Sequence, residues 1–170
     1  MGREGRVVLL LAGDVMTGRG IDQILKHPAD PALNEPLVRD AREYVRLAES
    51  VNGPIASGAE PGYIWGDALA EMDGTGADLR IVNLETAITA DGDPWPAKGV
   101  RYRMHPDNID CLSAAHIDAC ALANNHTLDW DRAGLHDTLQ ALRAAGVRFA
   151  GAGAERHAAD DLDLFEDDLL

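Results

Sequence analysis

Three apolar stretches of this sequence each end in side chains that could bind a metal ion or an anion. Asp14 follows the first stretch, Glu85 follows the second, and Asn124, Asn125 and His126 follow the third. Carboxylate and amide oxygens suit hard divalent ions, and imidazole suits borderline ones. If these stretches are strands of one sheet, their ends would line a site where two metal ions activate water and clamp a phosphoryl oxygen.

Each of these residues also has a purely structural explanation when it is taken alone. Asp14 is an ordinary turn residue after a strand, and Glu85 could cap a helix or a turn. His126 could be a core histidine with satisfied hydrogen bonds. Core packing gives no reason for two asparagines before it, because buried amides cost free energy unless something binds them. The coincidence of three strand ends therefore favours a metal-dependent site.

Strands must position these residues, and four apolar runs predict them. The runs cover residues 6–12, 79–85, 117–126 and 146–153. Short continuous runs of Val, Leu, Ile and Ala are typical of strands that are buried on both faces. We therefore predict that the first run is a buried central strand.

Helices are predicted between the strands. Apolar residues recur every three or four positions over 37–48 and 131–145, and a shorter helix is predicted over 105–116. Asp131 can cap the second of these helices and Gly146 can end it. Alternating strands and helices indicate an α/β protein, and such proteins bind ligands beyond the carboxyl ends of their strands.

The composition limits the class of protein further. The chain has 170 residues, 46% of them hydrophobic, and a formal net charge of -14, which fits one soluble globular domain and argues against nucleic-acid binding. Asp14 interrupts the first apolar run, and no run reaches the roughly 18 residues of a membrane span, so we expect no membrane anchor and a cytoplasmic location. Cys111 and Cys120 are expected to be buried free thiols. Residues 12–20 lack a phosphate-binding-loop ending, which disfavours a nucleotide-binding protein.

Several motifs resemble those of the CapA capsule-synthesis proteins, a bacterial family associated with poly-γ-glutamate biosynthesis and similar to the calcineurin-like metallophosphatases. These motifs are LLLAGDVMTGRG, LRIVNLETAIT and the long stretch from VRYRMHPD to RFAGAG. The resemblance implies the N-terminal part of a metallophosphatase-like αββα sandwich, with a domain over 1–155. Residues 156–170 are acidic and are expected to form a disordered tail or a solvated helix.

The resemblance implies a role for each residue at the strand ends. Asp14, Glu85 and Asn125 would be ligands of divalent metal ions such as Mn, Fe, Zn or Mg. His126 would protonate the leaving group or hold the scissile phosphate, work for which imidazole is suited near neutral pH.

Three more residues are candidates for contact with substrate. Arg19 could contact an anionic substrate, although it could also be an exposed helix-surface residue. His105 either starts a helix or contacts substrate. Asn124 either shapes the turn or takes part in substrate binding. The substrate would be an anionic or phosphorylated compound or a polyglutamate polymer.

Two departures from the family pattern leave the activity open. Met16 stands where the wider metallophosphatases have a metal-binding histidine, and the later His-Trp-Gly and Gly-His-His-Pro-His motifs are absent. The residues present would form about half a coordination sphere. One hypothesis is a phosphoester hydrolase when the site is complete, and the alternative is a non-catalytic remnant or a polymer-binding scaffold. A sheet edge exposed by missing strands invites self-association.

Overall fold

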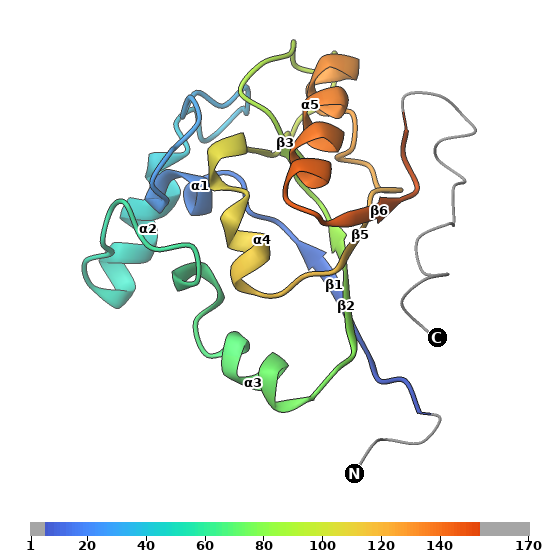
Figure 1. Ribbon diagram of the computed structural model, residues 1–170. Helices are drawn as coiled ribbons and strands as arrows, with labels where there is room; N and C mark the ends of the chain where they lie inside the picture. Colours follow the sequence, from blue (N-terminus) through green and yellow to red (C-terminus); the bar gives the residue numbers. More distant parts are fainter. Residues whose placement is uncertain (1–5, 154–170) are drawn as a thin grey trace.

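In the computed structural model, residues 6–153 are described, and they form a parallel sheet with its helices on one side (Figure 1). The strand order is β1-β2-β5-β6, and every neighbouring pair is parallel. These strands are β1 (Leu9–Val15), β2 (Leu79–Leu84), β5 (Ala119–Ala121) and β6 (Arg148–Ala150). The predicted α/β class is confirmed, because parallel neighbours joined by helical crossovers define that class.

The helical elements occupy the connections between the strands. The helices are α1 (Gly20–Ile24), α2 (Arg42–Asn52), α3 (Ala68–Gly74), α4 (Asp110–Ala114) and α5 (Asp131–Ala144), and the short 3-10 turns are η1 (Tyr63–Trp65) and η2 (Pro106–Asn108). A small second sheet pairs β3 (Ala87–Ile88) with β4 (Arg103–Met104).

The predicted boundaries are correct at both ends of α5 and shifted elsewhere, but Asp131 is the first residue of α5 and not its cap, which is Trp130 without a side-chain cap hydrogen bond. Gly146 follows α5 with a φ of 71°, the left-handed conformation that glycine adopts most easily after a helix. The helix predicted over 37–48 begins instead at Arg42, because Asp40 forms a β-bridge with Ala32 and accepts a hydrogen bond from the Arg42 backbone amide. The element predicted over 105–116 is divided into η2 and α4.

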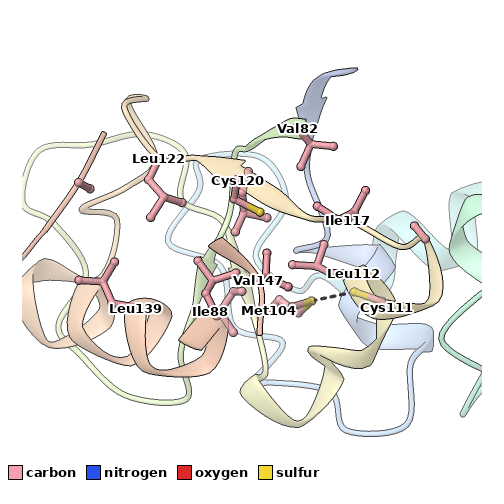
Figure 2. Close-up of a cluster of buried hydrophobic side chains, with 14 residues drawn as sticks. Val82, Ile88, Met104, Cys111, Leu112, Ile117, Cys120, Leu122, Leu139 and Val147 are labelled. Atoms are coloured by element: carbon pink, nitrogen blue, oxygen red, sulfur yellow. Dashed lines mark hydrogen bonds between the residues drawn. The ribbon is translucent and has the colours of Figure 1, made fainter. Parts of the chain in front are cut away.

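The core lies between the sheet and helices α4 and α5 (Figure 2). Leu112 of α4 and Leu142 of α5 are completely buried in this cluster. Cys111 and Cys120 are buried and free, which confirms the prediction for both thiols. Burial raises the pKa of each to about 12, and the Cys111 Sγ lies 3.5 Å from the Met104 Sδ.

The prediction that the first strand is central and buried is wrong. β1 lies at the edge of the sheet, and its Leu9 and Leu11 side chains are 52% and 71% exposed. On β2 the alternate residues Val82 and Leu84 are buried, whereas Ile81, which pairs with Leu11, lies on the partly exposed face. An apolar run indicates burial on both faces, but within residues 6–153 the helices cover only one face.

A buried carboxylate fixes the loop after α1 against η2. Asp22 accepts hydrogen bonds from the backbone amides of Ala29 and His105, at 2.6 and 2.9 Å, and from Asn108 Nδ2 at 3.0 Å. Burial raises the pKa of the Asp22 carboxyl, and these hydrogen bonds act in the opposite direction. Helix α1, which begins directly after Arg19, is thereby held against the start of η2.

Two predictions concern regions or properties beyond this fold. The acidic tail predicted over 156–170 lies outside the described residues, so that boundary stays a prediction. No helix within residues 6–153 is both long enough and apolar enough to cross a lipid bilayer.

Candidate functional site

A chain of side-chain hydrogen bonds joins the carboxyl ends of β1 and β2 to the turn after β5. Asn83 Nδ2 donates to Asp14 Oδ1 at 2.7 Å, and Asn124 Nδ2 donates to Asn83 Oδ1 at 2.9 Å. Asn124 also donates to the Leu84 carbonyl and accepts from the His126 backbone amide, both at 2.9 Å. Three predicted residues therefore lie together, linked by Asn83. The sequence analysis did not single out Asn83, which is marked in the sequence only as a polar residue inside an apolar run.

The His126 ring is buried and held by three neighbours. Asp129, which is fully buried, places Oδ2 2.7 Å from the ring nitrogen Nδ1, and the Tyr102 ring stacks on the imidazole with centroids 4.0 Å apart. Lys98 Nζ donates to the Asp129 carboxylate and to the Asn125 carbonyl, and it lies 3.3 Å from Nδ1. The backbone amide of Tyr102 donates to Asp129 Oδ2 at 2.6 Å.

This arrangement determines what each imidazole nitrogen can do. An ionised carboxylate only accepts hydrogen bonds, so Nδ1 of His126 carries the proton that it shares with Asp129. In the neutral ring, Nε2 is then an acceptor that can bind a metal ion or take up a proton. Lys98, Tyr102 and Asp129 did not stand out in the sequence, and only the three-residue spacing between His126 and Asp129 hinted at the contact.

Glu85 faces the free side of the same ring. His126 Nε2 lies 3.6 Å from Glu85 Oε1, and the Glu85 side chain is 19% exposed. Two ligands about 2.1 Å from one tetrahedral ion lie roughly 3.4 Å apart, so this spacing suits a shared divalent ion. Within residues 6–153, however, no group of three or more His, Cys, Asp or Glu side chains could hold a metal. His126 and Glu85 are therefore of the right chemical types to bind a divalent ion, but they are too few to hold one by themselves.

Asn125 lies on the surface beside this chain of contacts. It lines a groove of about 1120 Å³ between the 95–98 loop, the turn after β5 and α5. Lys98, Arg132 and His136 bring positive or titratable groups to the groove, and Trp95 adds an aromatic ring that is 41% exposed. The hydrogen bonds that join Asp14 to His126 pass through Asn124 and bypass Asn125.

Arg19 lies close to the site in a strained backbone conformation. Its φ of 51° and ψ of -127° are typical of glycine, and such a conformation costs of order 1–3 kcal/mol. The guanidinium pairs with Glu35 and lies 4.9 Å from the Tyr44 ring centroid and 5.1 Å from that of Tyr102. Its Nε is buried and has no hydrogen-bond partner among the described residues. Arg19 therefore contacts Tyr102, the same ring that stacks on His126.

His105 occupies the start of η2, in agreement with one of its two predicted roles. Its Nδ1 accepts a hydrogen bond from the Asp107 backbone amide at 3.2 Å. Its side chain is 27% exposed. Contact between His105 and substrate stays a prediction.

These features define an α/β protein with a polar site at the carboxyl ends of a parallel sheet, the place where open α/β sheets bind their ligands. Residues 8–167 match the family described as bacterial capsule synthesis protein PGA_cap. Because the match covers most of the sequence, the chain belongs to this family.

The chain is also similar to individual proteins, one of which is named for polyglutamine synthesis. The chain is 52% identical over 158 residues to a probable polyglutamine synthesis accessory protein of Mycobacterium tuberculosis H37Rv, an alignment that covers 93% of this chain and 42% of that protein. It is 31% identical over 121 residues to an uncharacterized protein, y4sH, of Sinorhizobium fredii, which covers 68% of this chain and 25% of that protein. The chain thus spans less than half the length of these relatives.

Proposed function

We propose that this chain contributes part of a metal-dependent phosphoester hydrolase site to capsule or poly-γ-glutamate synthesis. The observation that carries the proposal is the placement of His126 Nε2, 3.6 Å from Glu85 Oε1, while Asp129 holds the opposite ring nitrogen. Family membership supports the role in capsule synthesis, and the M. tuberculosis relative is named for polyglutamine synthesis. The phosphoester chemistry is inferred from the types of side chain at the strand ends.

In this proposal Asp14, Glu85 and Asn125 supply oxygen ligands to one or two divalent ions. A bound ion would supply an activated water and neutralise charge on a phosphoryl oxygen. His126 moves a proton at Nε2 or hydrogen-bonds the phosphoryl group, and Asp129 keeps its ring in the required orientation. The Arg19 guanidinium, which pairs with Glu35 and lies 5.1 Å from the Tyr102 ring centroid, would contact an anionic substrate.

A second candidate is a non-catalytic subunit that binds an acidic polymer. It is favoured by the lack of a three-residue metal cluster within the described part of the chain. The groove beside Asn125 offers Lys98, Arg132 and His136, groups that attract carboxylates in an otherwise acidic protein.

Manganese retention tests the metal-binding part of the first candidate. The full chain is incubated with manganese, passed through a desalting column and measured by elemental analysis. We expect retained manganese in the wild type and its loss in Asp14→Ala and Glu85→Gln. Asp67→Ala is the matched control, because Asp67 is exposed and its side chain makes no cap hydrogen bond at α3. Equal manganese in all four proteins, or none in the wild type, would contradict the assignment.

Activity and polymer binding then separate the two candidates. Hydrolysis of a chromogenic phosphodiester that requires manganese and is lost in His126→Ala would support the hydrolase. Calorimetric binding of poly-γ-glutamate that is lost in Arg132→Glu, without any hydrolysis, would support the polymer-binding subunit instead.

A further inference from the structure

An irregularity in β1 decides which face of the sheet Asp14 occupies. The register against β2 shifts at Gly13, and Asp14 consequently lies opposite Asn83. If the regular pairing continued, Asp14 would instead lie opposite Leu84, which is 1% exposed in the core. A shift of one residue moves the side chains that follow it to the other face of a sheet. The extra residue in β1 therefore keeps the Asp14 carboxylate out of the core and places it beside the Asn83 amide.

Backbone groups fix the orientation of the neighbouring Asn124 amide. Asn124 Oδ1 accepts from the His126 backbone amide, which can only donate, and Asn124 Nδ2 donates to the Leu84 carbonyl, which can only accept. A reversed amide would lose both hydrogen bonds, so the positions of its nitrogen and oxygen are determined. The second hydrogen bond of Asn124 Nδ2 goes to Asn83, whose oxygen must therefore face it.

The direction of these hydrogen bonds continues to Asp14. Because the Asn83 oxygen faces Asn124, the Asn83 nitrogen faces Asp14 and donates to Oδ1 at 2.7 Å. An ionised carboxylate only accepts hydrogen bonds, so this contact suits a charged Asp14. Within residues 6–153, Asp14 Oδ2 accepts no hydrogen bond and is available to an ion.

We propose that Asn83 is a positioning residue of the metal site, an inference that rests on the proposed function. Asn83 holds Asp14 through Oδ1, leaves Oδ2 for the ion, and is itself anchored by Asn124 to the turn after β5. Side chains that hold a metal ligand in one orientation contribute to affinity without touching the ion. Asn83 acts in this way, and its effect on metal binding passes through Asp14.

Manganese titration of the metal-free full chain, followed by electron paramagnetic resonance, measures this effect. Asn83→Leu keeps the approximate size of the side chain and removes both hydrogen bonds. We expect it to weaken manganese binding by about 10–100-fold, as is typical when the partner of a metal ligand is removed. Asp14→Ala/Asn83→Leu should bind manganese as weakly as Asp14→Ala alone, because Asn83 acts through Asp14.

Ile81→Ala is the matched control for Asn83→Leu. Ile81 lies two residues before Asn83 on the same face of β2, and it is not one of the residues joined by these hydrogen bonds. The control should leave manganese affinity unchanged. Urea unfolding of both variants ensures that the titrations are made on folded protein. Equal losses of affinity in the two variants would indicate general destabilisation and would contradict the role of Asn83.

Side-chain amide signals in heteronuclear NMR spectra test the hydrogen bonds without any metal. Asp14→Ala should shift the side-chain amide signals of both Asn83 and Asn124, because hydrogen bonds in series polarise one another. Asp67→Ala should shift neither signal.

The possible outcomes separate this proposal from the proposed function. Equal manganese affinity in the wild type and Asn83→Leu would overturn the role of Asn83 and leave the proposed function standing. No manganese binding by the wild type would overturn both. Unchanged Asn83 amide signals in Asp14→Ala would show that the two side chains are not hydrogen-bonded in solution, which would also overturn the role of Asn83.

Discussion

Replacing Lys98 by methionine removes the cation that accompanies a completely buried carboxylate. Asp129 is 0% exposed, and Lys98 Nζ, His126 Nδ1 and the Tyr102 amide all donate to it. Removing one partner of a buried ion pair costs about 3–5 kcal/mol. Because the Lys98 side chain is 22% exposed and water reaches it, we expect a smaller loss, about 2–3 kcal/mol of the free energy of unfolding.

Urea unfolding of a double-mutant cycle measures this loss directly. Asp129→Asn removes the charge that Lys98 neutralises, so the double variant Lys98→Met/Asp129→Asn should be more stable than the sum of the single losses predicts. We expect a coupling free energy of about 1 kcal/mol or more, as for other contacting charges. A coupling near zero would show that the two groups do not interact in solution.

Lys26→Met is the matched control for the same experiment. Lys26 pairs with Glu60 at 2.8 Å, but the two side chains are 46% and 78% exposed. An exposed pair of this kind contributes about 0–1 kcal/mol. If Lys98→Met lowers the free energy of unfolding no more than Lys26→Met does, then the burial of Asp129 does not strengthen its pairing with Lys98. Our account of how the His126 ring is held would then be wrong.

Four further predictions concern buried thiols and backbone geometry. Cys111 and Cys120 should not react with a thiol-specific disulfide reagent at pH 8 until the protein unfolds, because a pKa raised from 9.0 to about 12 removes nearly all thiolate. The folded state also holds these protons more tightly than the unfolded state, so the free energy of unfolding should fall between pH 9 and pH 10.5 in urea titrations. Gly18→Ala should destabilise by more than about 1 kcal/mol, since its Cβ would lie 2.9 Å from backbone atoms of β4, whereas Gly13→Ala meets nothing within 4 Å and should cost less in the same assay. Arg19→Gly should be about 1 kcal/mol more stable than Arg19→Ala in thermal unfolding, because glycine adopts a φ of 51° without strain. Equal stability of the two Arg19 variants would show that this conformation is not strained.

The sequence was sufficient to predict the strand ends that collect the polar residues. The alternation of apolar runs and helical periods requires parallel strands, and parallel strands bring Asp14, Glu85 and the turn after β5 to one edge. The position of β1 in the sheet could not be predicted in the same way. Strand order depends on which other segment covers or pairs with an apolar run, and the composition of the run does not contain that information.

The residues that hold His126 were beyond prediction for a different reason. Lys98 is 31 residues from Asp129 in sequence, and Tyr102 is 27 residues away, so their contacts with it exist only after β4 and the preceding loop have packed against the turn. Local spacing can indicate a pair such as His126 and Asp129. It cannot indicate a lysine or an aromatic ring that a distant loop delivers.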